Sequence, residues 1–236
     1  MDSSPLNTAL KDLRTIDVER NIRRFLAGEG KDKGRHPDER YASFDYCYNY
    51  FQSFREQGRI EDICSPAHMQ RGCLELGFYL ASWGMLRGSS FLLGKSVKFY
   101  ERLLQAIVRL DRMVWEVDVD SYTEKHIDLL LTARNAIQEA LGRENRPSDT
   151  LVTKIMLGVF GNVPAFDNFF RRGFEVGAIT RKNLARVAEF YAHHKAVIDG
   201  TTICTFDFAT GSETTRRYSK AKIVDMVGFM EGQNGV

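Results

Sequence analysis

Apolar residues recur three and four positions apart along most of this chain, which is the spacing of one face of an α-helix. Serine, threonine or aspartate precedes several of these stretches and glycine follows several, as at helix ends. The pattern predicts a short helix after Asp167 and longer helices over residues 6–26, 41–54, 65–85, 97–109, 123–141, 148–160, 181–198 and 218–231.

One stretch has the pattern of β-structure instead. Residues 201–214 alternate β-branched and aromatic side chains around a Thr-Gly-Ser turn, which predicts a small hairpin near 203–214. We therefore predict an all-α fold, a single multi-helix globular domain with a small β-hairpin near the C-terminal part. Residues 1–40 would form an N-terminal helix and a mobile loop rich in Gly, Lys and Asp, and residues 41–236 the all-α domain.

Composition excludes several classes of function. With 33 Lys+Arg against 31 Asp+Glu, the formal net charge of +2 does not by itself mark a nucleic-acid binder, although a local basic face is compatible with it. The four cysteines lack the spacing of metal ligands, and no P-loop, dinucleotide-binding fingerprint or HExxH motif occurs, so we expect no metal and no cofactor.

The chain also lacks the marks of export or membrane insertion. Its N-terminus alternates charged and apolar residues, unlike a signal peptide. The most apolar run, residues 74–86, is much shorter than the roughly 20 apolar residues of a membrane span. We therefore expect a cytoplasmic protein with no membrane partner.

The segment with most chemical content is 148–174. An apolar helix ends at a Gly-Asn-Val-Pro break, Asp167 stands at the entrance of the next helix, and Arg171 and Arg172 follow. A helix N-terminus favours a carboxylate in its ionised form and can present amides to a phosphate. Asp167 could equally be an ordinary N-cap, which Asp often is. Both roles stay open for this residue.

Part of this segment resembles the second half of the helix–hairpin–helix DNA glycosylase superfamily. The matching features are Phe160-Gly161, the link Val163-Pro164-Ala165-Phe166, then Asp167 and the paired arginines; residues 218–226 are similar to the closing helix of degenerate bacterial relatives. The resemblance implies DNA as partner and a base-excising N-glycosylase, with Asp167 as catalytic carboxylate and Lys154 near the position of a Schiff-base lysine. The chain departs from the family because residues 147–153 lack the phosphate-binding glycines, and Lys154 is about one helical turn too near Asp167.

Further cations could contact nucleic acid. Arg171 and Arg172 follow Asp167, Arg87 lies among small and hydroxyl residues beside Trp83, and Lys220 and Lys222 belong to a basic cluster near the C-terminus. Each could instead belong to a solvated face, and the aromatic residues of 41–54 could be core or a stacking platform for bases. Three functions therefore remain: a DNA glycosylase-like enzyme, a non-catalytic relative that binds nucleic acid or protein, and a small-ligand or nucleotide pocket around Trp83, Arg87, Ser89 and Ser90.

Overall fold

The computed structural model describes residues 11–30 and 33–234, and it confirms the predicted fold class. Within these residues ten α-helices accompany one antiparallel two-stranded sheet. The helices are α1 Val18–Ala27, α2 Ser43–Glu56, α3 Met69–Ser82, α4 Glu101–Val108, α5 Glu124–Ala140, α6 Asp149–Phe160, α7 Asn168–Phe174, α8 Arg181–His193, α9 Lys195–Gly200 and α10 Lys220–Gln233. The strands are β1 Cys204–Phe206 and β2 Glu213–Arg217. Short 3-10 turns, among them Phe91–Gly94, Val119–Ser121 and Arg143–Asn145, join several of them.

Side-chain caps fix where several helices begin. In each case an oxygen of the residue before the helix accepts a backbone N–H of the first turn, which would otherwise lack a partner. The capping residues are Asp17 for α1, Thr123 for α5, Ser148 for α6, Asp167 for α7, Thr180 for α8 and Ser219 for α10. The capping role predicted for Asp167 is thus confirmed.

Several helices differ from their predicted bounds. Residues 97–100 form a 3-10 turn before α4, and the predicted helix over 181–198 divides at His194 into α8 and α9. Helix α1 begins at Val18 because Ile16 is extended and Asp17 accepts from the amide of Arg20; residues 6–10 of the predicted helix lie outside the described range. Helix α3 begins at Met69 and ends at Ser82, since residues 65–68 form turns and Gly84 has a φ of +75°. Local turn geometry therefore overrides the apolar periodicity at these ends.

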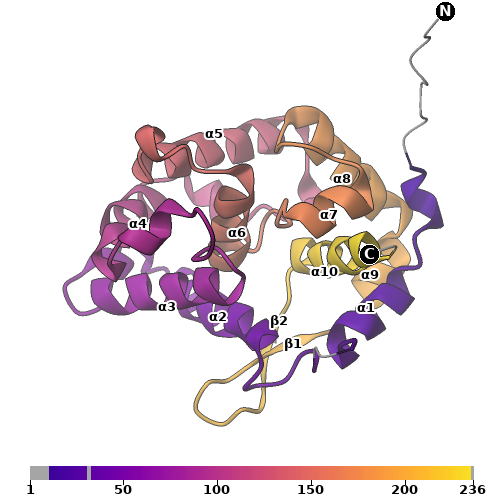
Figure 1. The fold of residues 1–236 in the computed structure, drawn as a ribbon, viewed down its shortest axis with the longest axis horizontal. Helices are drawn as coiled ribbons and strands as arrows, with labels where there is room; N and C mark the ends of the chain where they lie inside the picture. The colour runs from indigo at the N-terminus through magenta and orange to yellow at the C-terminus, as the bar shows by residue number, and fades with distance from the viewer. Residues whose placement is uncertain (1–10, 31–32, 235–236) are drawn as a thin grey trace, which may run out of the picture.

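The core is organised around two buried helices, α6 and α10. All residues of α6 from Leu151 to Phe160 are buried, and so are those of α10 from Ala221 to Met230. Helix α6 contacts α2, α3 and α5, whereas α10 contacts α7, α1 and α9 (Figure 1). A mostly apolar helix without a polar face is typical of the interior of a protein, and both α6 and α10 are of this kind.

Helices α7 and α10 approach very closely at glycines. A Cβ on Gly232 would overlap the backbone carbonyl of Phe169, and a Cβ on Gly173 would overlap the carbonyl of Gly228. Side chains at these positions would push the two helices apart. The short helix α7, and Asp167 at its N-terminus, are thereby held directly against the buried helix α10.

The described N-terminal residues belong to the same packed unit. Phe25 of α1 stacks on Tyr41 and meets Phe229 of α10 edge to face. Arg35, from the segment predicted to be a mobile loop, is buried and bonds Asp45 of α2 and the hydroxyl of Tyr218. Residues 31–32 of that segment lie outside the described range.

Candidate functional site

The two residues proposed as catalytic, Lys154 and Asp167, lie together. The Lys154 Nζ is 3.2 Å from Asp167 Oδ2, and their side chains are 4% and 16% exposed. The other carboxylate oxygen of Asp167 accepts the amides of Phe169 and Phe170, both at 3.0 Å. One carboxylate thus caps α7 and is the counter-charge of a buried ammonium group.

The link between α6 and α7 brings these residues together. Thr153 Oγ1 accepts the amide of Phe166 at 2.8 Å, and Thr150 Oγ1 donates to the Phe166 carbonyl at 2.8 Å. These bonds fold residues 163–166 back against the helix they have just left. Asp167 therefore reaches Lys154 across only 13 positions, the short spacing that departs from the glycosylase pattern.

A second amine–carboxylate pair, Lys222 with Asp225, lies inside the protein. The Lys222 Nζ is 2.9 Å from Asp225 Oδ2, and the side chains are 2% and 10% exposed. Asp225 Oδ1 accepts the amide of Ala165 at 2.9 Å and so holds the same link. The prediction that Lys222 belongs to an exposed basic cluster is wrong, because α10 is buried on every face and carries this lysine inward.

Trp83, at the end of α3, joins the two pairs. Its ring lies 5.0 Å from Lys154 Nζ and 5.2 Å from Lys222 Nζ, within the range of cation–π attraction. The ring also stacks on Tyr41, and its buried Nε1 has no hydrogen-bond partner. We call Lys154, Asp167, Lys222 and Asp225, with Trp83 between them, the central charge cluster.

Both carboxylates of the central charge cluster act on the buried side chain of Tyr79. Burial raises the pKa of the Tyr79 hydroxyl well above its usual value, and the negative charges of Asp225 and Asp167 raise it further. Both carboxylates are therefore close enough to act on one phenol inside the core.

The central charge cluster is costly for the fold. Taking ammonium and carboxylate groups out of water carries a desolvation penalty that their mutual attraction offsets only with good geometry. Because of this cost, buried charged groups are often retained for function and are found at functional sites, although structural ion-pair networks contain them too. An amine and an ionised carboxylate in contact could together transfer a proton, attack an electrophilic carbon or stabilise a developing cation.

The other predicted binding residues lie apart from the central charge cluster. Arg171 and Arg172 are exposed on α7, and Arg172 donates to the carbonyl of Gly232 at 3.3 Å. Arg87 is exposed on the loop after α3. Lys220 is half-buried and pairs with Asp120 and, at 3.3 Å, with Asp199, so two carboxylates already neutralise it.

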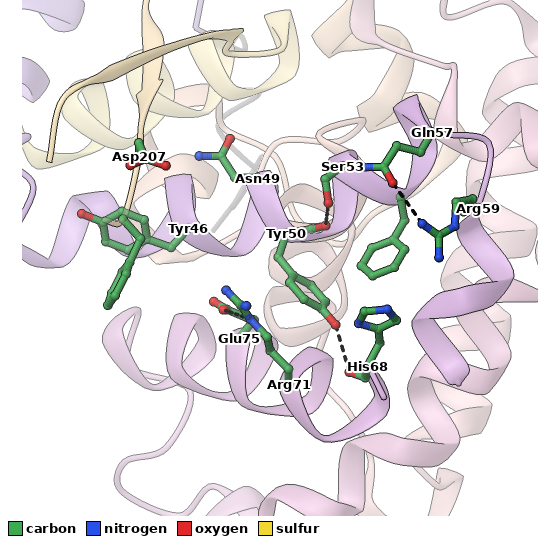
Figure 2. A pocket seen from close by; sticks show the side chains of 12 residues that line it. Tyr46, Asn49, Tyr50, Ser53, Gln57, Arg59, His68, Arg71, Glu75 and Asp207 are labelled. Atoms are coloured by element: carbon green, nitrogen blue, oxygen red, sulfur yellow. Dashed lines mark hydrogen bonds and ion pairs between the residues drawn. The ribbon is translucent and has the colours of Figure 1, made fainter. Parts of the chain in front are cut away.

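The cleft in Figure 2 collects a different set of residues. It has a volume of about 440 Å³ and lies between α2, α3 and the tip of the hairpin. Tyr46 and Tyr50 turn their rings toward it, while Phe44 and Phe51 of the same helix are core residues. Its lining holds charges of both signs, Arg59 and Arg71 together with Glu75 and Asp207, and Arg71 pairs with Glu75 at 3.3 Å. None of the predicted site residues lines it.

Sequence reasoning missed Asp225 as a site residue. The signal was present, because Lys222 and Asp225 are the only charged residues in the otherwise apolar stretch 221–230. At (i, i+3) spacing on a helix such residues lie on one face and can pair. Two opposite charges within an apolar helix therefore indicate a buried pair rather than a solvated basic face.

Comparison of the chain with models of protein families, with curated proteins and with solved structures gives no significant match. Within residues 11–30 and 33–234, no group of three or more His, Cys, Asp and Glu side chains could hold a metal ion. No helix in that part of the chain is long and apolar enough to cross a membrane.

Proposed function

We propose that this protein is a DNA-directed N-glycosylase that releases a base from its deoxyribose, with Asp167 and Lys154 as catalytic residues. The observation that carries the proposal is their contact at 3.2 Å, at the N-terminus of α7. The resemblance of residues 160–172 to helix–hairpin–helix glycosylases agrees with it.

Each residue has a definite part in the reaction. The bond between C1′ of the sugar and the base nitrogen breaks, and its electron pair leaves with the base. The Asp167 carboxylate stabilises the positive charge that develops on the sugar. A water molecule then adds to C1′ and gives a proton to Asp167, which acts as general base and passes that proton to the departing base.

Lys154 offers a second route. In its neutral form the amine could add to C1′ in place of water, and its proton would pass to Asp167. The base leaves as the amine bonds to C1′. The C1′–O4′ bond would then break, O4′ would take the proton held by Asp167, and a Schiff base between Lys154 and the sugar would result. Borohydride reduces such an intermediate to a stable protein–DNA adduct, so the two routes are separable by experiment.

The test uses single- and double-stranded DNA that carries alkylated, oxidised or deaminated bases, scored for abasic sites. We expect Asp167→Asn to lower base release by at least about 100-fold, the lower range for loss of a catalytic acid or base. Asp118→Asn is a matched control, because Asp118 also accepts helix amides, those of Lys220 and Ala221, without contacting Lys154. All variants are assayed below their melting temperatures.

Two outcomes contradict the proposal. If the Asp167→Asn variant releases bases at the wild-type rate, Asp167 is not a catalytic residue. If the wild-type protein binds these DNAs but releases no base, the result would instead favour a non-catalytic nucleic-acid binder. The exposed Arg171 and Arg172, which lie on α7 after Asp167, are then the candidate contacts to nucleic acid.

A further inference from the structure

A second cleft, lined by residues that are close in the chain to Trp83 and Lys154, has an unusual charge composition. It has a volume of about 430 Å³ and is bounded by the loop after α3 and the loop that enters α6. We call it the arginine cleft; the residues that line it are Gly84, Met85, Arg87, Ser89, Ser90, Phe91, Asn145, Arg146, Ser148 and Leu151. Its charged lining residues are Arg87 and Arg146, and no carboxylate belongs to the lining. The cleft of Figure 2, by contrast, carries both signs of charge.

The two arginines come from different walls and both are exposed. Neither forms an ion pair with a described residue, whereas at least twelve of the 22 arginines of this protein do. Two carboxylates lie close to Arg146 in the sequence. Asp149 bonds Arg134 at 2.6 Å and the amide of Ile179 at 3.0 Å, and Glu144 does not line the cleft. Within the described residues, no carboxylate therefore pairs with either arginine of the cleft.

The backbone at Arg146 is strained as well. Its φ of +47° and ψ of +58° lie in the left-handed region, which side chains with a Cβ rarely adopt. Gly or Asn would fit this position with less strain. Such strain persists where the surrounding structure imposes it, and it collects at ligand-binding sites.

We propose that the arginine cleft binds a phosphate group through Arg87 and Arg146. A guanidinium group presents a planar fork of N–H donors that matches two phosphate oxygens, and two of them on facing walls can hold one dianion. The Ser89 hydroxyl, on the same wall as Arg87, adds a further donor.

The position of the arginine cleft gives the phosphate a place in the proposed reaction. Leu151 lines the cleft and Lys154 follows it three positions later on α6, about 4.5 Å further along the helix axis. On the other wall, Gly84 lines the cleft and is preceded by Trp83. A nucleotide unit whose phosphate occupies the cleft would extend toward the central charge cluster. This step, that the phosphate belongs to the substrate, rests on the proposed function; the phosphate site itself does not.

Isothermal titration calorimetry tests the site with four probes: inorganic phosphate, deoxyadenosine 5′-monophosphate, deoxyadenosine, and a short oligonucleotide without terminal phosphates. The variant is the double substitution Arg87→Gln with Arg146→Asn, since Asn removes the charge and tolerates the left-handed backbone. Arg143→Gln is the matched control, because Arg143 lies in the same loop, is exposed, and is not among the cleft residues. Thermal melting verifies that each variant is folded.

We expect the wild-type protein to bind the monophosphate and inorganic phosphate, and to bind deoxyadenosine at least tenfold more weakly than the monophosphate. The double variant should lose about tenfold in affinity for each arginine, as for a lost charge-assisted hydrogen bond, and Arg143→Gln should bind as wild type. If the oligonucleotide also binds and its binding depends on both arginines, the phosphate that the cleft recognises is one of the nucleic-acid backbone. If only the monophosphate binds, the cleft recognises the phosphate of a free nucleotide or of a strand end.

Equal affinity for deoxyadenosine and its monophosphate, or an unchanged affinity in the double variant, would overturn the proposed phosphate site. The two proposals fail separately. Phosphate binding without base release leaves the phosphate site intact and removes the glycosylase. Base release that is unaffected by the double variant leaves the glycosylase intact and removes the claim that the phosphate belongs to its substrate.

Discussion

Replacing Asp167 by Asn should destabilise the fold by far more than the loss of a helix cap. Asn caps a helix about as well as Asp, so the cap alone predicts a change of only a few tenths of a kcal/mol. The structure adds a second partner, because Lys154 is 4% exposed and pairs with Asp167 at 3.2 Å. The substitution leaves this buried ammonium group without a counter-charge.

The magnitude follows from the burial of the pair. Removing one partner of a buried ion pair costs about 3–5 kcal/mol, and the 16% exposure of Asp167 favours the lower value, about 3 kcal/mol. For a chain of this size about 1 kcal/mol shifts the melting temperature by roughly 2–4 °C. We expect Asp167→Asn to melt about 6–12 °C below wild type, and Asp167→Ala about 2–4 °C lower still, since Ala also loses the cap.

Replacing the other partner of the pair, Lys154, should destabilise the fold less. In Lys154→Met the Asp167 carboxylate keeps two backbone N–H donors at 3.0 Å and its partial access to water, so we expect a cost of about 1 kcal/mol. The double variant, Lys154→Met with Asp167→Asn, contains neither charge and should melt within about 4 °C of wild type. Differential scanning calorimetry of the four proteins completes a double-mutant cycle.

The result that refutes this reasoning is additivity. If the double variant loses the sum of the two single losses, Lys154 and Asp167 do not stabilise each other. If Asp167→Asn melts with the wild type while Asp167→Ala loses about 1 kcal/mol, Asp167 acts on stability only as a helix cap.

Two further predictions concern other parts of the fold. Gly232→Ala should destabilise the fold by about 2 kcal/mol or more, because the new Cβ would overlap the Phe169 carbonyl. The control Gly200→Ala should not lower the melting temperature, because apart from the adjacent chain no atom of the described residues would lie within 4 Å of its new Cβ. Equal melting temperatures of the two variants would refute the close approach of α7 and α10. Burial raises the pKa of Asp118 to about 6, against roughly 3.9 in an unfolded chain, so its contribution to stability is present below about pH 4 and is lost as the pH rises through about 6. The stability of wild type relative to Asp118→Asn should therefore fall between about pH 4 and 6 in thermal melts, and a flat difference would refute the shift.

Local patterns in the sequence were sufficient for much of the fold. The all-α class, the hairpin and the caps at Thr123, Ser148 and Asp167 follow from interactions among residues close in the chain. Periodicity fixed which stretches are helical, because it reflects the geometry of the helix itself. The ends at Val18 and Met69 differed because capping and turn bonds, which periodicity does not contain, decide where a helix starts.

The site depended on contacts that local patterns do not contain. The sequence indicated Asp167 and Lys154 as candidates, but only the tertiary structure decided that they touch, because Thr153 and Thr150 fold the link back onto α6. The tertiary structure also shows that Lys222, which was expected at the surface, is buried. Helical periodicity tells which residues share a face; what packs against that face depends on helices far away in the chain, and that packing decides whether a lysine is solvated or buried beside a carboxylate.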